Sequence, residues 1–210
     1  MIQRKKNHVG NTGLQAGVAA MVPMWISPNM LTIMRICMTL CILLVDVFAA
    51  SLWWVLVMGF CAGMSDFVDG AVARQRGQIT QLGSYLDPLA DKILGAVVGF
   101  ILWRRGVLPT LPLALVLAAE GHALLLPILH VLRRRFQGRP ITPLPKVRAN
   151  VWGKWKFGAL AWGMAFMMLG ALLDWPFGLG FGAFGVWLAV VLGWIAFARY
   201  TYDWFKEQWN

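Results

Sequence analysis

Residues 65–92 read SDFVDGAVARQRGQITQLGSYLDPLADK, and this segment holds four of the nine acidic residues of a 210-residue chain. Apolar sequence precedes Asp66 and Asp69, and apolar sequence follows Asp87 and Asp91. Carboxylates beside hydrophobic segments are costly unless cations or a bound substrate neutralise them. The segment is therefore predicted to form a functional site.

Helical spacing places these acids on shared faces. At about 100° per residue, Asp66, Asp69, Gly70 and Ala73 fall on one face of a helix, where the two small residues leave room for a ligand. The next helix repeats the pattern with a glycine and two acids at intervals of four residues: Gly83, Asp87 and Asp91. If the intervening loop folds the two helices together, four carboxylates meet. Such a site suits a pair of Mg²⁺ or Mn²⁺ ions rather than zinc, which prefers thiolate or imidazole ligands.

The composition is that of an integral membrane protein. Hydrophobic residues make up 59% of the chain, charged residues 13%, and the mean hydropathy is +0.64. This balance excludes an ordinary soluble domain. Six apolar segments have the length needed to span a bilayer: 30–48, 52–73, 84–103, 111–132, 152–173 and 181–198. The sequence predicts an all-α protein with a bundle of six transmembrane helices.

The N-terminal segment, residues 1–27, differs from the rest. It begins with Arg4, Lys5 and Lys6 and continues with a mildly apolar run at 17–26 that Pro23 interrupts. This run is too short to span a membrane, so we expect a helix lying at the membrane interface, followed by one membrane domain at 28–210. A targeting segment is the alternative.

Basic residues define the orientation. Fifteen of the 19 Lys and Arg residues fall on the side that carries the N-terminus, against only Arg104 and Arg105 on the other side. The positive-inside rule then places both termini and the acidic cluster in the cytoplasm, as expected for a multi-pass protein of a bacterial inner membrane. The net charge of +10 favours anionic lipid headgroups and nucleotide phosphates. Nucleic acid is a poor partner, because no nucleic-acid-binding module accompanies these charges.

Eight spaced residues carry a family resemblance. They read Asp66-x2-Asp69-Gly70-x2-Ala73-Arg74-x8-Gly83-x3-Asp87-x3-Asp91. The pattern resembles the signature of CDP-alcohol phosphatidyltransferases at all eight specified positions. The sequences LDPLADK at 86–92 and PNMLTIMR at 28–35 are similar to phosphatidylglycerophosphate synthases and CDP-dependent cardiolipin synthases in particular.

The resemblance implies a reaction and a set of roles. Such enzymes use the hydroxyl of an alcohol to attack the β-phosphate of a CDP-linked lipid, and they release CMP. Asp91 would be the general base, and two divalent metal ions would be held by Asp66, Asp69, Asp87 and Asp91. The CDP-lipid would be bound by Asp66, Gly70, Ala73, Arg74, Gly83 and Asp87. A homodimer is also implied.

The basic connection at 133–156 is the second informative region. Its basic residues either set the orientation in the membrane through the positive-inside rule or form a pocket for the phosphate of the acceptor alcohol. Gly153-Lys154-x-Lys156 is similar to an element of glycerophosphate-using relatives, which favours Lys154 and Lys156, with Arg148 and Arg133 as further candidates. Two departures weaken this assignment: Phe157 stands where relatives have Thr, and Ala119 stands where they have Arg. Glu120 is predicted either to pair with a neighbouring helix or to build the acceptor pocket.

Several functional alternatives stay open. Glycerol 3-phosphate as the acceptor gives phosphatidylglycerophosphate, whereas phosphatidylglycerol gives cardiolipin. Among other classes, an intramembrane prenyltransferase also binds pyrophosphate through paired aspartates, and a cation transporter uses intramembrane acids. Neither class needs the frame of Gly70, Ala73, Arg74 and Gly83, so the transferase is the favoured function.

Overall fold

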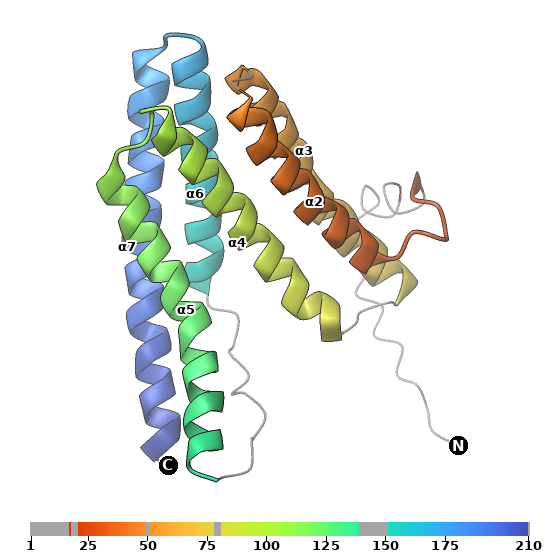
Figure 1. Ribbon diagram of the computed structural model, residues 1–210, viewed down its shortest axis with the longest axis vertical. Helices are drawn as coiled ribbons and strands as arrows, with labels where there is room; N and C mark the ends of the chain where they lie inside the picture. The colour runs from red at the N-terminus through yellow and green to blue at the C-terminus, as the bar shows by residue number, and fades with distance from the viewer. Residues whose placement is uncertain (1–16, 18–20, 49–50, 78–80, 139–150, 210) are drawn as a thin grey trace. The chain divides into compact units, whose positions relative to one another are not determined.

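The computed structural model describes residues 17, 21–48, 51–77, 81–138 and 151–209. Within them the chain is helical, with six long helices (Figure 1): α2 (Pro28–Val47), α3 (Leu52–Arg76), α4 (Gln81–Arg104), α5 (Thr110–Phe136), α6 (Val151–Leu172) and α7 (Pro176–Trp209). The chain forms two compact units, residues 1–97 and 98–210. Each unit is described separately below.

Helix ends follow from local chemistry. Ser27 caps α2, where its hydroxyl accepts from the Met30 amide at 3.3 Å, and Pro28 occupies the first turn, where a missing amide hydrogen costs nothing. Ser51 caps α3 in the same way. Gly77 ends α3 with a φ of 62°, a left-handed conformation that glycine adopts without strain.

In the first unit α2 and α3 lie side by side (Figure 1). Arg76 at the end of α3 reaches back to the segment before α2. It donates to the carbonyl oxygens of Ile26 at 2.7 Å, Val22 at 2.5 Å and Pro23 at 3.2 Å. Residues 22–27 form turns rather than a regular helix. The rest of the predicted interfacial helix, apart from residues 17 and 21, lies outside the described residues.

In the second unit α7 packs against α6 and α5. Glycines make the approach of α6 and α7 close. A Cβ atom added at Gly163 would lie 2.7 Å from the Val186 nitrogen and 2.9 Å from the Gly182 oxygen, and one added at Gly182 would lie 2.5 Å from the Met167 nitrogen. Small residues at such positions allow backbone contact between membrane helices.

Membrane-spanning character is clearest for part of the chain. Within the described residues, four helical segments are long and apolar enough to cross a membrane: Pro28–Val47, Leu52–Arg76, Trp152–Leu172 and Pro176–Arg199. Helices α4 and α5 have 24 and 27 residues and occupy the other two predicted positions. A membrane protein is thus supported, and six crossings stay a prediction.

Candidate active site

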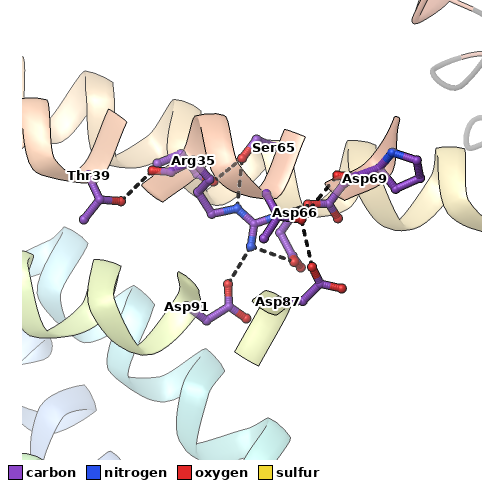
Figure 2. A network of polar contacts seen from close by, with 10 residues as sticks. Arg35, Thr39, Ser65, Asp66, Asp69, Asp87 and Asp91 are labelled. Atoms are coloured by element: carbon purple, nitrogen blue, oxygen red, sulfur yellow. Dashed lines mark hydrogen bonds and ion pairs between the residues drawn. The ribbon is translucent and has the colours of Figure 1, made fainter. Parts of the chain in front are cut away.

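Arg35 stands at the centre of the acidic cluster in the first unit. From α2, its Nη1 atom donates to Asp66 Oδ1 at 3.0 Å and to Asp91 Oδ1 at 2.9 Å (Figure 2). Its Nη2 atom donates to Asp69 Oδ2. The Arg35 side chain is fully buried. One guanidinium therefore joins carboxylates from α3 and α4.

The fourth carboxylate is held by Thr32, one turn before Arg35 on α2. The Thr32 hydroxyl lies 2.9 Å from Asp87 Oδ1 and 3.5 Å from Asp69 Oδ2. It also lies 3.3 Å from the Pro28 carbonyl oxygen. Since one hydroxyl donates one hydrogen, the short contact to Asp87 is the dominant one. Two side chains of α2 thus contact all four predicted acids.

A serine fixes the orientation of the guanidinium. Arg35 Nε donates to Ser65 Oγ at 3.0 Å, and Ser65 Oγ in turn donates to the Ala62 carbonyl oxygen at 2.7 Å (Figure 2). This contact does not depend on any carboxylate. Arg35 is consequently held in place from the side of α3 as well as by the acids.

The acids differ in exposure. The Asp69 side chain is 4% exposed, that of Asp91 is 27% exposed and that of Asp66 is 49% exposed. Asp69 therefore forms the floor of the cluster. Asp66 and Asp91 lie on its more exposed side.

The donor set has the chemistry of a divalent-cation site, since carboxylate oxygens are the ligands that Mg²⁺ and Mn²⁺ prefer. Among the described residues, however, no three His, Cys, Asp or Glu side chains are gathered closely enough to hold a metal ion as they stand. The guanidinium of Arg35 lies among them instead. The acids fit such a cation by type, and their contacts with Arg35 must change for one to bind.

The predicted nucleotide-binding residues lie on α3 and α4. The Arg74 side chain folds back over Gly70. This is shown by the distance of 3.2 Å that would separate a Cβ atom added at Gly70 from Arg74 Nη1. Ala73 is half-buried and Gly83 is buried. Gly70 thus provides the space that the Arg74 guanidinium occupies.

The predicted acceptor residues belong to the second unit. Lys156 Nζ donates to Glu120 Oε1 in an ion pair whose side chains are 18% and 19% exposed. The Lys156 stem passes close to Gly193, where an added Cβ would lie 3.2 Å from Lys156 Cδ. Lys154 is exposed. Arg148 and the side chain of Arg133 lie outside the described residues.

Three residues of the acidic network were not predicted from the sequence: Thr32, Arg35 and Ser65. Arg35 did carry a signal, because a charged residue within an apolar segment requires a partner. Thr32 and Ser65 carried none, since hydroxyl side chains in membrane helices commonly bond to the preceding turn.

Comparisons with known proteins agree with the motif. The family model described as CDP-alcohol phosphatidyltransferase matches residues 25–197. A protein of Streptomyces coelicolor named "Cardiolipin synthase (CMP-forming)" is 46% identical over 83 residues, which cover 39% of this chain and 37% of that protein.

Two further relatives carry the name "CDP-diacylglycerol--glycerol-3-phosphate 3-phosphatidyltransferase". The protein of Rickettsia bellii is 36% identical over 95 residues, covering 44% of this chain and 52% of the relative. The protein of Haemophilus influenzae is 30% identical over 112 residues, which cover 49% of this chain and 56% of that relative. The match therefore spans about half the length of these relatives or less. Because the family model covers most of the sequence, the chain belongs to the CDP-alcohol phosphatidyltransferase family.

Proposed function

We propose that this protein transfers a phosphatidyl group from CDP-diacylglycerol to glycerol 3-phosphate and releases CMP. The observation that carries the proposal is the convergence of four acids of the family motif around Thr32 and Arg35. Family membership supports the CDP-lipid as donor. The names of the Rickettsia and Haemophilus relatives support the acceptor.

The reaction assigns a proton transfer to Asp91. The acceptor hydroxyl oxygen forms a bond to the β-phosphorus of the CDP-lipid, and the bond from that phosphorus to the bridging oxygen breaks, so that this oxygen leaves with CMP. The hydroxyl proton passes to an oxygen of Asp91. The Asp91 carboxylate is partly exposed, and Arg35 Nη1 contacts it through Oδ1. Its second oxygen can accept the proton.

The four acids together would supply negative charge for the cations, and neighbouring motif residues would bind the donor. Asp66, Asp69, Asp87 and Asp91 would hold two Mg²⁺ or Mn²⁺ ions, which supply positive charge next to the pyrophosphate. Gly70, Ala73 and Gly83 would give space to the cytidine nucleotide. Arg74, which is exposed and lies over Gly70, would bind a phosphate oxygen through charge-assisted hydrogen bonds.

The acceptor phosphate would be bound by basic residues of the second unit: Lys154, Lys156, Arg133 and Arg148. Lys156 is the best defined of these, because Glu120 holds its ammonium group in a largely buried position. We further propose that the protein is a homodimer in the bacterial inner membrane, with the acidic cluster on the cytoplasmic side. Charge asymmetry along the sequence supports this orientation.

A second acceptor has its own support. The Streptomyces relative, 46% identical over its matched region, is named a CMP-forming cardiolipin synthase. Phosphatidylglycerol would then replace glycerol 3-phosphate. It offers a hydroxyl of the same chemistry but no terminal phosphate monoester, so it would make weaker demands on Lys154 and Lys156.

The test is a transfer assay with the purified protein in detergent. CDP-diacylglycerol and Mg²⁺ or Mn²⁺ are supplied with glycerol 3-phosphate, phosphatidylglycerol, serine or inositol phosphate in parallel, and lipid products are read by mass together with CMP release. We expect phosphatidylglycerophosphate, loss of product on chelation, and product formation at least about 100-fold slower from Asp91→Asn. A wild-type protein that releases no CMP with any acceptor would refute the transferase, and cardiolipin as the main product would change the acceptor.

A further inference from the structure

The charge balance of the acidic cluster is uneven. Among the contacts of the described residues, the Arg35 guanidinium bonds directly to three of the four carboxylates, those of Asp66, Asp69 and Asp91. Arg35 is fully buried and Asp69 nearly so, so water screens this part of the cluster poorly. Without Arg35, Asp66, Asp69 and Asp91 would repel one another at close range.

Guanidinium and metal ion impose different geometries on the same oxygens. Arg35 Nη1 holds oxygens of Asp66 and Asp91 at 3.0 and 2.9 Å, while Asp69 contacts a different nitrogen. A Mg²⁺ ion requires all its ligands at about 2.1 Å from one centre. These oxygens are therefore arranged around two nitrogen atoms of a guanidinium, and among the described residues no three such side chains are gathered as a metal ion requires. Binding an ion requires carboxylates to leave Arg35 and close in.

Arg35 has an anchor that survives this exchange. Its Nε contact with Ser65 involves no acid, and Ser65 is itself bonded to the Ala62 carbonyl. The guanidinium can therefore remain at the edge of the cluster when the carboxylates turn toward a cation.

We propose that Arg35 is a positioning residue that assembles the carboxylates before a divalent cation arrives and is exchanged for the cation on binding. The inference rests on the proposed function for its choice of cation. Arg35 thereby stabilises the cation-free protein and raises the cation concentration that the site needs. Its charge and the cation compete for Asp66, Asp69 and Asp91.

The test measures cation binding and thermal unfolding, without lipid substrates, for wild type, Arg35→Lys and Arg35→Gln. Mn²⁺ affinity is measured by electron paramagnetic resonance, and melting is followed with EDTA and with Mn²⁺. We expect Arg35→Gln to melt at a lower temperature than wild type in EDTA. When Mn²⁺ is added, its melting temperature should return most of the way to that of wild type. Arg35→Gln should also bind Mn²⁺ at least about tenfold more tightly than wild type. The Mn²⁺ affinity of Arg35→Lys should fall between those of wild type and Arg35→Gln, because lysine keeps the positive charge but lacks the planar guanidinium that bonds to several carboxylates.

Arg104→Gln is the matched control. It removes the same charge from the last turn of α4, in the second unit and outside the acidic cluster, and it should leave Mn²⁺ affinity unchanged.

Mn²⁺ affinity that is unchanged or weaker in folded Arg35→Gln would overturn the exchange, as would a melting loss of equal size with and without Mn²⁺. If Arg35→Gln does not fold, the affinity of Arg35→Lys decides in the same way. Wild-type protein that binds no Mn²⁺ also overturns the inference. Failure of the exchange leaves the transferase proposal intact, whereas a protein that exchanges Arg35 for Mn²⁺ but makes no lipid product refutes only the proposed function.

Discussion

The ion pair of Lys156 and Glu120 gives a prediction in which Glu120→Gln lowers stability but strengthens acceptor binding, whereas Lys156→Met weakens both. The pair joins α6 to α5 within the second unit, and both side chains are less than one-fifth exposed. The perturbation is a double-mutant cycle of Glu120→Gln, Lys156→Met and the combined variant. Glutamine keeps the size and hydrogen-bonding shape of glutamate but removes the charge.

The expected energies follow from the burial. An exposed ion pair contributes about 0–1 kcal/mol, whereas breaking a fully buried one costs about 3–5 kcal/mol. At this partial exposure, each single change should lower the free energy of unfolding by about 1–3 kcal/mol. The double variant should lose less than the sum of the two, by about 1–2 kcal/mol, because it leaves no unpaired charge. Unfolding in mixed micelles, followed by tryptophan fluorescence, provides the measurement.

The Glu120→Gln substitution should strengthen the binding of a phosphorylated acceptor. If Lys156 binds the acceptor phosphate, that phosphate lies within about 6 Å of the Glu120 carboxylate, which repels it by about 0.7 kcal/mol even in a water-like medium. Glu120→Gln should therefore lower the KM for glycerol 3-phosphate by at least about threefold, while Lys156→Met should raise it.

A matched cycle uses Lys154→Met, which alters an exposed lysine two positions along α6 and should show no coupling to Glu120→Gln. Additive stability effects for Lys156 and Glu120 would show that the pair is energetically unimportant. A KM that rises in Glu120→Gln would refute the competition and make Glu120 a residue that positions Lys156 for the acceptor.

Three more predictions concern single residues. Asp91→Asn keeps an oxygen for Arg35 but loses the proton acceptor, so kcat should fall by about 10²- to 10⁴-fold with little change in CDP-lipid binding; near-normal kcat would contradict the assignment. Lys154→Ala should raise the KM for glycerol 3-phosphate and leave kcat unchanged, and an unaltered KM would remove Lys154 from the acceptor site. Gly163→Ala should lower the free energy of unfolding by about 1–3 kcal/mol, because its Cβ meets backbone atoms of α7, whereas Gly158→Ala enters open space and should cost nothing; equal effects would argue against close packing there.

Apolar segment length predicted where the long helices lie, but not where they end. The predicted segment at 181–198 corresponds to α7, which runs from Pro176 to Trp209. Hydropathy marks the part of a helix that lipid surrounds, whereas the helix itself continues into polar sequence as long as its backbone bonds persist. Proline is compatible with the first turn of a helix, so α7 begins at Pro176, five residues before the apolar segment.

Periodicity predicted which acids share a face, but not what holds them together. Asp66 and Asp69 do face the same guanidinium, as their three-residue spacing implies. Their partner Arg35 lies 31 and 34 residues earlier in the sequence, and no local pattern specifies such a distance. For Glu120, pairing with a neighbouring helix was one of two interpretations, and the structure supplies Lys156 as the partner.

The position of Thr32 and Arg35 on α2 explains why the acidic motif alone does not define the site. Both residues lie on one face, three positions apart, and together they contact acids from α3 and α4. A shift of one residue in the register of α2 would rotate this face by about 100° and withdraw both contacts at once. The carboxylates would then lose the positive charge of Arg35 that neutralises them, and their alignment with it. Helix α2, which contributes none of the eight motif residues, is therefore as necessary to the geometry of the cluster as the two helices that carry the motif.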